Sequence, residues 1–261
     1  YYYDIVMRNY TDETKISQTY KLNHRNQTSD YVKSMLDIHC TRFDKCKMSI
    51  NDILALQDKI IDESDPDLEN AQIVHAYQTA ERVRQQFPDQ DYLHLVGLLH
   101  DCGKVLLLDE FGGLPQWSVV GDTFPVGCKH SDKIVYPEYF KDNPEHQKML
   151  FGDYFPGCGI DHLLFSFSHD IYAYLVFKHN GCLIPEDGLK IIRYHSFYSW
   201  HNHGAYEHFM IDGDYKIRDM CQKFSLCDLY SKKDVPVNID EVKTYYDGLI
   251  EKYFPKTILD W

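Results

Sequence analysis

The stretch Tyr92–Val105, YLHLVGLLHDCGKV, places an adjacent His100-Asp101 pair, followed by Gly103 and Lys104, in a run that is apolar on almost every side of a helical projection. A helix that is hydrophobic all round is normally buried. A buried charge without a partner costs several kcal/mol. The His, Asp and Lys side chains therefore need a compensating partner, and a metal ion would supply one. A buried Asp101–Lys104 ion pair beside an ordinary core histidine is the alternative.

Composition limits the classes of protein that fit. The chain has 261 residues, enough for one large domain or two small ones, and 44% of them are hydrophobic, which supports a substantial core. Its net charge is -13 and the sequence contains no basic stripe. This charge balance argues against nucleic acids and anionic membranes as partners, and it disfavours a strongly anionic substrate.

The cysteines and the absence of long apolar runs indicate a cellular location. Eight cysteines form no Cys-x-x-Cys pair and no framework spacing, so they are predicted to be free thiols in a reducing compartment. No apolar run approaches the roughly 18 residues of a membrane span, and no signal peptide is visible. The sequence begins at Tyr1 without a Met, so a targeting signal before it would be invisible. We expect a cytoplasmic protein.

Turn residues and apolar periodicity divide the chain into helices. Tyr1–Thr28 is predicted to be irregular, Ser29 and Ser49 to begin helices, and Asp52 to complete a capping box with Ser49. Phe111–Cys128 is a Gly/Pro-rich loop of a length typical of functional loops. The predicted helices cover Ser29 to about Phe43, Ser49 to about Ile61, Asn70–Gln86, Asp91–Leu108, Asp161–His179, Pro185–Tyr198, Tyr215–Lys232 and Ile239–Tyr253.

No segment alternates as a strand does, and the stretch from His130 to Cys158 is polar and interrupted by prolines. The sequence therefore predicts an all-α fold, a helical bundle in a single domain that spans residues 1–261. One long functional loop interrupts it.

Further candidate ligands lie on these helices, and each has an ordinary structural explanation. His75 shares its side of the helix with Gln78 and Arg82, so periodicity alone predicts it to be exposed. His169 lies in the nearly continuous apolar run Leu163–Phe177, where a core histidine is the alternative. His195 follows Ile191-Ile192 by one turn and is predicted to face inward. Asp228 and Lys232 are four residues apart, which an exposed salt bridge would also explain.

The order of these residues is more informative than any one of them. A His, then an adjacent His-Asp pair, then further His residues and a late Asp on successive helices resembles the HD-domain superfamily. That resemblance implies that Asp101 bridges two metals, since metals about 3.5–4 Å apart need such a carboxylate. Imidazoles with carboxylates suit Fe, Zn, Ni or Mn, so the ligands alone do not name the metal.

Several longer strings resemble the myo-inositol oxygenase family, and the resemblance extends from about Arg8 to Trp261. They are IDESDPD at Ile61–Asp67, HAYQTAE at His75–Glu81, LLHDCGK at Leu98–Lys104, PQWSVVGDTFPVGC at Pro115–Cys128, IRYHSFYSWH at Ile192–His201, DLYSK at Asp228–Lys232 and YYDGLIEKYFP at Tyr245–Pro255.

The resemblance implies an HD-type, all-helical monomer with a mixed-valent Fe(II)/Fe(III) pair that cleaves one C–C bond of myo-inositol with dioxygen, giving D-glucuronate. It implies that His75, His100 and Asp228 hold the first iron, that His169 and His195 hold the second, and that Asp101 bridges them. Lys104 and Asp101 would be the catalytic residues. The implied substrate-binding residues are Arg8, Asp62, Ser64, Lys104, Gly121, Asp122, His195, Ser196 and Lys232.

These residue types suit the implied chemistry. Inositol is neutral and offers only hydroxyls, with which Asp62, Asp122 and Ser196 can form hydrogen bonds, and a site built for hydroxyls rejects analogues that lack them. A metal lowers the pKa of a bound alcohol. We expect Lys104, beside the irons, to have a lowered pKa and to exchange that proton. No organic cofactor is required.

The chain departs from the family in two places. The family usually has Ser-Trp-Gly-His-Asp where this chain has Ser166 to Asp170, SFSHD, and Phe-Asn-Lys-Tyr/Phe-Asp where it has Phe224 to Asp228, FSLCD. Every implied ligand is retained. The differences affect the packing that orients the ligands, which can alter activity about 10- to 100-fold.

Two other functions use the same ligands. An HD-domain metal-dependent phosphohydrolase would need basic residues to hold phosphate, and the sequence offers Lys104, Lys232 and Arg8 against an acidic background. A non-enzymatic HD-like binding protein would be expected to lack at least one ligand, and all six are present.

Overall fold

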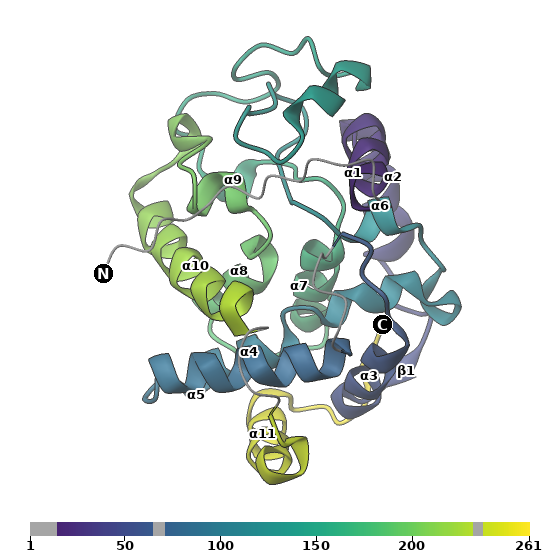
Figure 1. Cartoon of the computed structure of the whole chain (residues 1–261), viewed down its shortest axis with the longest axis vertical. Helices are drawn as coiled ribbons and strands as arrows, with labels where there is room; N and C mark the ends of the chain where they lie inside the picture. Colours follow the sequence, from purple (N-terminus) through teal and green to yellow (C-terminus); the bar gives the residue numbers. More distant parts are fainter. Residues whose placement is uncertain (1–14, 65–70, 232–236) are drawn as a thin grey trace.

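The computed structural model describes residues 15–64, 71–231 and 237–261 (Figure 1). Its helices are α1 (Lys15–Asn26), α2 (Ser29–His39), α3 (Ile50–Leu56), α4 (Gln72–Gln86), α5 (Asp91–Leu99), α6 (Gln116–Val119), α7 (His169–His179), α8 (Glu186–Tyr194), α9 (Tyr198–His201), α10 (Asp212–Ser231) and α11 (Ile239–Tyr253). Six short 3-10 helices join them: η1 (Gln57–Lys59), η2 (Cys102–Leu107), η3 (Asp109–Phe111), η4 (Pro137–Asp142), η5 (Ile160–His162) and η6 (Glu207–Phe209). The predicted all-α fold is confirmed.

The strands are a minor addition that the sequence did not predict. β1 (Lys47–Met48) pairs antiparallel with β2 (Leu259–Asp260), which ties the C-terminal residues to the segment before α3. Trp261 is fully buried there and its indole nitrogen donates to the carbonyl of Met48 at 3.2 Å. Among the described residues no helix is both long enough and apolar enough to cross a membrane.

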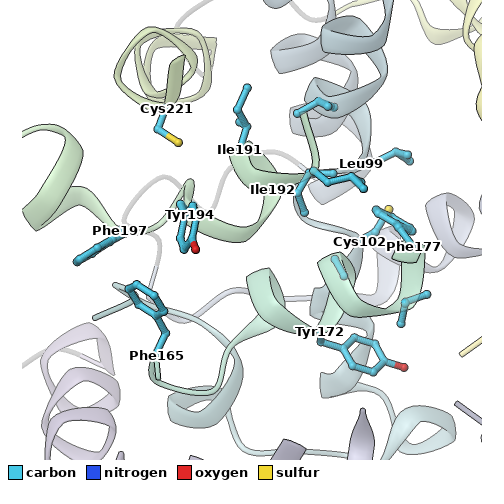
Figure 2. Close-up of a cluster of buried hydrophobic side chains, with 14 of the residues drawn as sticks. Leu99, Cys102, Phe165, Tyr172, Phe177, Ile191, Ile192, Tyr194, Phe197 and Cys221 are labelled. Atoms are coloured by element: carbon cyan, nitrogen blue, oxygen red, sulfur yellow. The ribbon is translucent and has the colours of Figure 1, made fainter. Parts of the chain in front are cut away.

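Helices α4 and α5 form the closest pair of the bundle, and α10 and α8 pack against them (Figure 1). A glycine permits the close approach, because a Cβ at Gly97 of α5 would lie 2.8 Å from the Cα of Ala80 on α4. Figure 2 shows the core beside them, where Ile191 and Ile192 of α8 lie between Cys221 of α10 and Leu99. The core is therefore built from the helices that carry the candidate ligands.

The predicted helix Asp91–Leu108 is wrong in its second half. The α-helix ends at Leu99, His100 is the C-terminal cap residue, and the chain continues as η2 from Cys102. Asp101 lies at the junction with φ -94° and ψ 1°, a backbone region in which many active-site residues are found. The segment Tyr92–Val105 is almost entirely apolar, so its sequence carries no pattern that shows where the helix ends.

The predicted helix Asp161–His179 begins eight residues later, at His169. The apolar residues before it are extended and pair with the long loop. Val126 donates to the carbonyl of Leu164, and Ser166 donates to that of Phe124, both at 2.8 Å. A short apolar run fits a buried extended segment as well as a buried helix, and the sequence did not distinguish them.

The N-terminal part of the chain is also more ordered than predicted. Residues 15–26 form α1, and its Tyr20, Asn23 and His24 are buried. Asn23 donates to the carbonyl of Trp117 at 2.8 Å, so contacts with the long loop hold this polar helix in place. Helix α2 begins at Ser29 as predicted, with Thr28 as its cap residue, and it ends at His39, before the predicted end near Phe43.

The remaining helices are close to prediction. The capping box of Ser49 and Asp52 is present at α3, although α3 ends at Leu56 and the chain continues through η1. Helix α8 ends at Tyr194, four residues before its predicted end, and α10 begins three residues earlier than predicted. The bounds of α11 are as predicted, and all eight cysteines are free thiols.

Two buried histidines hold one phenylalanine between them. The rings of His24 and His130 stack on Phe140 with centroids 4.1 and 4.0 Å away. Burial lowers the pKa of His24 to about 3 and that of His130 to about 4. Neither ring nitrogen of His130 has a hydrogen-bond partner among the described residues. Both rings are therefore neutral in the folded protein at neutral pH.

The histidine pair predicts a loss of stability in acid. These two histidines take up protons near pH 6.5 in the unfolded chain but only near pH 3–4 in the folded chain. The stability that their neutral burial provides is therefore fully present above pH 6.5 and is lost as the pH falls below it. His130→Phe should keep its packing, leave stability at pH 7 unchanged or higher, and remove roughly 2–3 kcal/mol of the loss between pH 7 and pH 4. Urea denaturation at several pH values measures this, with exposed His162→Phe as the control. Equal pH slopes for the wild type and His130→Phe would contradict it.

Candidate metal centre

Six side chains from five parts of the chain converge at one place inside the bundle. His75 lies on α4, His100 and Asp101 follow the end of α5, and His169 is the first residue of α7. His195 is the cap residue of α8, and Asp228 lies on α10. None is more than 6% exposed. The prediction that His75 is exposed is wrong, because Gln78 on its side of the helix is also buried.

The six side chains form two groups that share Asp101. His75, His100 and Asp101 have ligand atoms within 4.8 Å of one another, as do Asp101, His169 and His195. The Oδ2 atom of Asp101 lies 3.4 Å from the Nε2 of His100, whereas its Oδ1 lies 3.2 Å from the Nε2 of His169. The Oδ1 of Asp228 lies 3.0 Å from the Nε2 of His75 and so joins the first group. One carboxylate thus presents one oxygen to each group.

Backbone carbonyls fix which nitrogen of each ring faces the centre. The Nδ1 atoms of His100, His169 and His195 donate to the carbonyls of Gly97, Val119 and Ile192 at 2.7–2.8 Å. The proton is thereby held on Nδ1, and the lone pair of Nε2 points into the cluster. This is the arrangement found in metal-ligating histidines.

The charges of the cluster fit a cation. The Nε2 atoms of His169 and His195 lie 3.2 Å apart, so two lone pairs would face each other unless one ring carries a proton on Nε2 or a cation lies between them. Burial lowers the pKa of His169, but Asp170 and Asp101 outweigh it and raise that pKa to about 10. Burial likewise opposes ionisation of Asp228, whereas His100 and His75 hold its pKa well below the usual range. The donor set therefore fits metal ions, which would take the place of the protons.

Lys104 lies between two carboxylates. Its Nζ is 2.7 Å from the Oδ2 of Asp62 and 2.8 Å from the Oδ2 of Asp101. Burial by itself would lower the pKa of Lys104, but Asp101 and Asp62 raise it well above its ordinary value. The lowered pKa was expected for Lys104 beside two irons, and the two carboxylates alone have the opposite effect. The ion pair with Asp101, considered as an alternative, is present.

Most of the predicted substrate residues lie around the same cavity. Asp62, Ser64, Lys104, Gly121, His195 and Ser196 line it. Asp62 is positioned by Ser64, whose backbone N–H and hydroxyl both donate to its Oδ1. Asp122 does not line the cavity and accepts a hydrogen bond from the hydroxyl of Tyr20 at 2.9 Å. Arg8 and Lys232 lie outside the described residues.

The sequence interpretation missed Asp170. It is fully buried, its Oδ1 lies 2.9 Å from the Nε2 of His169, and it accepts hydrogen bonds from Thr123 and from the backbone and hydroxyl of Ser196. The signal was present, since His169-Asp170 repeats the His100-Asp101 pair. Tyr20, Tyr198 and Leu229 also line the cavity, and Gln72 accepts from Lys104 at 3.3 Å.

The two departures from the family are accommodated around the ligands. The backbone N–H and carbonyl of Phe167 pair with the side chain of Gln27 at 2.9 and 2.8 Å, and Ser168 accepts from the Thr123 hydroxyl at 3.2 Å. Ser225 accepts from Asn202 at 3.0 Å, and the thiol of Cys227 faces Gln86 at 3.5 Å. Each changed polar residue thus has a partner on a neighbouring element.

Fold and site together define an all-helical protein with a buried candidate metal centre in which one carboxylate is shared by two ligand groups. The family model described as myo-inositol oxygenase matches residues 13–261. A "Probable inositol oxygenase" from Oryza sativa subsp. japonica is 50% identical over 95% of this chain and 83% of its own length. Proteins named "Inositol oxygenase" from Danio rerio and Pongo abelii are 42% and 43% identical, covering 95% and 97% of this chain and 89% and 90% of their own. The chain belongs to the myo-inositol oxygenase family.

A close backbone contact holds the two halves of the centre together and can be tested. A Cβ at Gly103 in η2 would lie 2.0 Å from the carbonyl oxygen of His169, so Gly103→Ala must push η2 away from α7. We expect a loss of roughly 1–3 kcal/mol of stability and fewer metals bound per chain.

Gly248→Ala in α11 is the matched control, because nothing lies within 4 Å of its added Cβ and it should gain about 0.5–1 kcal/mol. Chemical denaturation and metal analysis of the purified proteins give both quantities. Wild-type stability and metal content in Gly103→Ala would show that the contact is not needed.

Proposed function

We propose that this chain cleaves the ring of myo-inositol with dioxygen, giving D-glucuronate, at a centre of two iron ions of mixed valence. Membership of the myo-inositol oxygenase family supports the reaction. The observation that carries the two-iron centre is the position of Asp101, with one oxygen facing His100 and the other facing His169. Myo-inositol and dioxygen balance D-glucuronate and water, so neither an organic cofactor nor an added reductant is consumed.

We assign the ligands as follows. His75, His100 and Asp228 would hold the first iron, His169 and His195 the second, and Asp101 would bridge both. The two groups around Asp101 and the backbone partners of the ring Nδ1 atoms support this assignment. When bound, the irons supply Lewis acidity toward a substrate hydroxyl and exchange electrons with dioxygen.

The residues around the cavity would bind and orient the polyol. Asp62 and Ser196 carry oxygen atoms that accept or donate hydrogen bonds to hydroxyls, and both line the cavity beside His195. Ser196 is held by Asp170, to which its hydroxyl donates at 3.1 Å. Asp170 would therefore orient Ser196, and its 2.9 Å contact with the metal-facing Nε2 of His169 puts its carboxylate directly beside the ligand set.

Lys104 would hold the proton that the reaction moves. Its ammonium already contacts the Oδ2 atoms of Asp62 and Asp101, one on the substrate side and one at the centre. A substrate hydroxyl that replaces Asp62 as partner can exchange a proton with Nζ at that position. We keep Arg8, Gly121, Asp122 and Lys232 as further substrate-binding candidates on the family resemblance.

The phosphohydrolase alternative is not favoured. The family match points to an oxygenase, and the cation that the described part of the cavity lining offers, Lys104, is already paired with two carboxylates. We further propose a monomeric, cytoplasmic protein that binds neither nucleic acid nor membranes. The net charge of -13 supports the lack of binding to these anionic partners.

The reaction itself can be tested directly. Protein loaded with iron and incubated with myo-inositol under air should form D-glucuronate and consume one dioxygen per molecule formed. The same protein should release no phosphate from nucleotides. Phosphate release without glucuronate would favour the phosphohydrolase and contradict the proposal.

Two variants separate the bridge from the proton carrier. Asp101→Ala should abolish binding of both metals, because each ligand group loses the Asp101 oxygen that faces it, whereas Lys104→Ala should keep the metals and lose turnover. The exposed Lys256→Met is the control and should retain both. Metal analysis and glucuronate formation are measured on the same samples. Two irons retained in Asp101→Ala would show that the bridging assignment is wrong.

A further inference from the structure

A second cavity lies in the same helical bundle, outside the site described above. Its volume is about 290 Å³ and its lining comes from α4, α5, α8 and α10 and from the connection between α4 and α5. Val83, Leu93, Ile191, Met220 and Phe224 make its walls largely apolar. Lys216 and Lys223 are exposed, which places them where the cavity reaches the surface.

Phe224 separates this cavity from the metal centre. Its ring lines the cavity, and its centroid lies 5.5 Å from the ring of His100 and 6.4 Å from that of His195. One ligand of each group therefore contacts the wall that faces the cavity. Asp228 follows Phe224 by one turn on the same side of α10, so the partition between cavity and centre is one side chain thick there.

The chemistry of the two sides differs. The inositol side offers Asp62, Lys104 and Ser196, whereas the buried walls of the second cavity are apolar side chains. Its other polar lining residues, Gln90, Tyr92 and Asp219, are at least partly exposed and so lie toward the mouth. An ion or a polyol would lose its hydration there without compensation. The charges at the mouth are paired with one another, Lys216 with Asp187 and Lys223 with Asp219, and do not attract an anion. The fitting occupant is a small apolar molecule.

We propose that this cavity takes up dioxygen and delivers it past Phe224 to the metal centre, by a route that shares no lining residue with the inositol site. The inference rests on the proposed function, because an oxygenase consumes dioxygen. Enclosed apolar cavities of about 150 Å³ bind apolar ligands and gases such as xenon, and the inner part of this cavity has walls of the same kind. Uptake from this side lets dioxygen reach the metals after inositol has closed the polar side.

Filling the cavity should impair the use of dioxygen alone. Met220→Trp places a bulky indole ring in the cavity. We expect the KM for dioxygen to rise roughly threefold or more, whereas the KM for inositol and the kcat at saturating dioxygen should stay unchanged. Leu93→Phe narrows the cavity from α5 and serves as a second variant. Tyr215→Trp on the exposed side of α10 is the matched control and should leave all three constants unchanged.

Xenon shows occupancy independently of turnover. Crystals of the iron-loaded wild type under xenon pressure should show the gas beside Phe224, and Met220→Trp crystals should lack it. An unchanged KM for dioxygen in both variants, or xenon absent from the wild-type cavity, would overturn the proposal. Failure of the wild type to form glucuronate would instead overturn the proposed function, so the two failures are distinguishable.

Discussion

The arrangement of the centre depends on where one helix stops. Helix α5 ends at Leu99, and Asp101 takes up φ -94° and ψ 1° before η2 begins. In a continuous α-helix the side chains of His100 and Asp101 would point about 100° apart. The break instead brings the Oδ2 of Asp101 to 3.4 Å from the Nε2 of His100 and leaves its Oδ1 facing His169. Gln57 supports the break by donating to the carbonyl of Asp101 at 3.2 Å.

Two of the candidate ligands are positioned by the ends of the helices that precede them. His100 and His195 are the cap residues of α5 and α8, and each donates from Nδ1 to the carbonyl three residues earlier. The last carbonyls of a helix have no partner within the helix, so the imidazole satisfies one of them and fixes its own tautomer in doing so. His169 reaches the centre differently, from the start of α7, and takes its partner from the long loop at Val119.

Apolar periodicity in the sequence measures which side chains are buried, and this decides which parts of the structure it could predict. Apolar periodicity predicted α4, α10 and α11 and the burial of His100, His169 and His195, because periodicity reports burial. It missed the end of α5 at Leu99 and the late start of α7. Those segments are apolar throughout, so their sequence has no pattern that separates a helix from another buried conformation. It also missed the burial of His75, since the polar Gln78 beside it is buried too.

The candidate ligands were predicted largely from their order in the sequence, and Asp170 was missed for the same reason. The ligand pattern does not include Asp170, whose contacts are with Thr123, His169 and Ser196. Such contacts join residues that are distant in the sequence, such as Thr123 and Asp170. The periodicity of a single helix therefore cannot predict them. The positions of Arg8 and Lys232 rest on resemblance, because they lie outside the described residues.

The division of the centre into a polar and an apolar side can be traced to the face of α10. Phe224 and Asp228 are one turn apart, so the helix presents an aromatic ring to the second cavity and a carboxylate to the metal centre from the same side. The residues in which this chain departs from its family lie between them and point elsewhere, Ser225 to Asn202 and Cys227 to Gln86. The departures therefore change the packing of α10 against α9 and α4 while the face that carries Phe224 and Asp228 is kept.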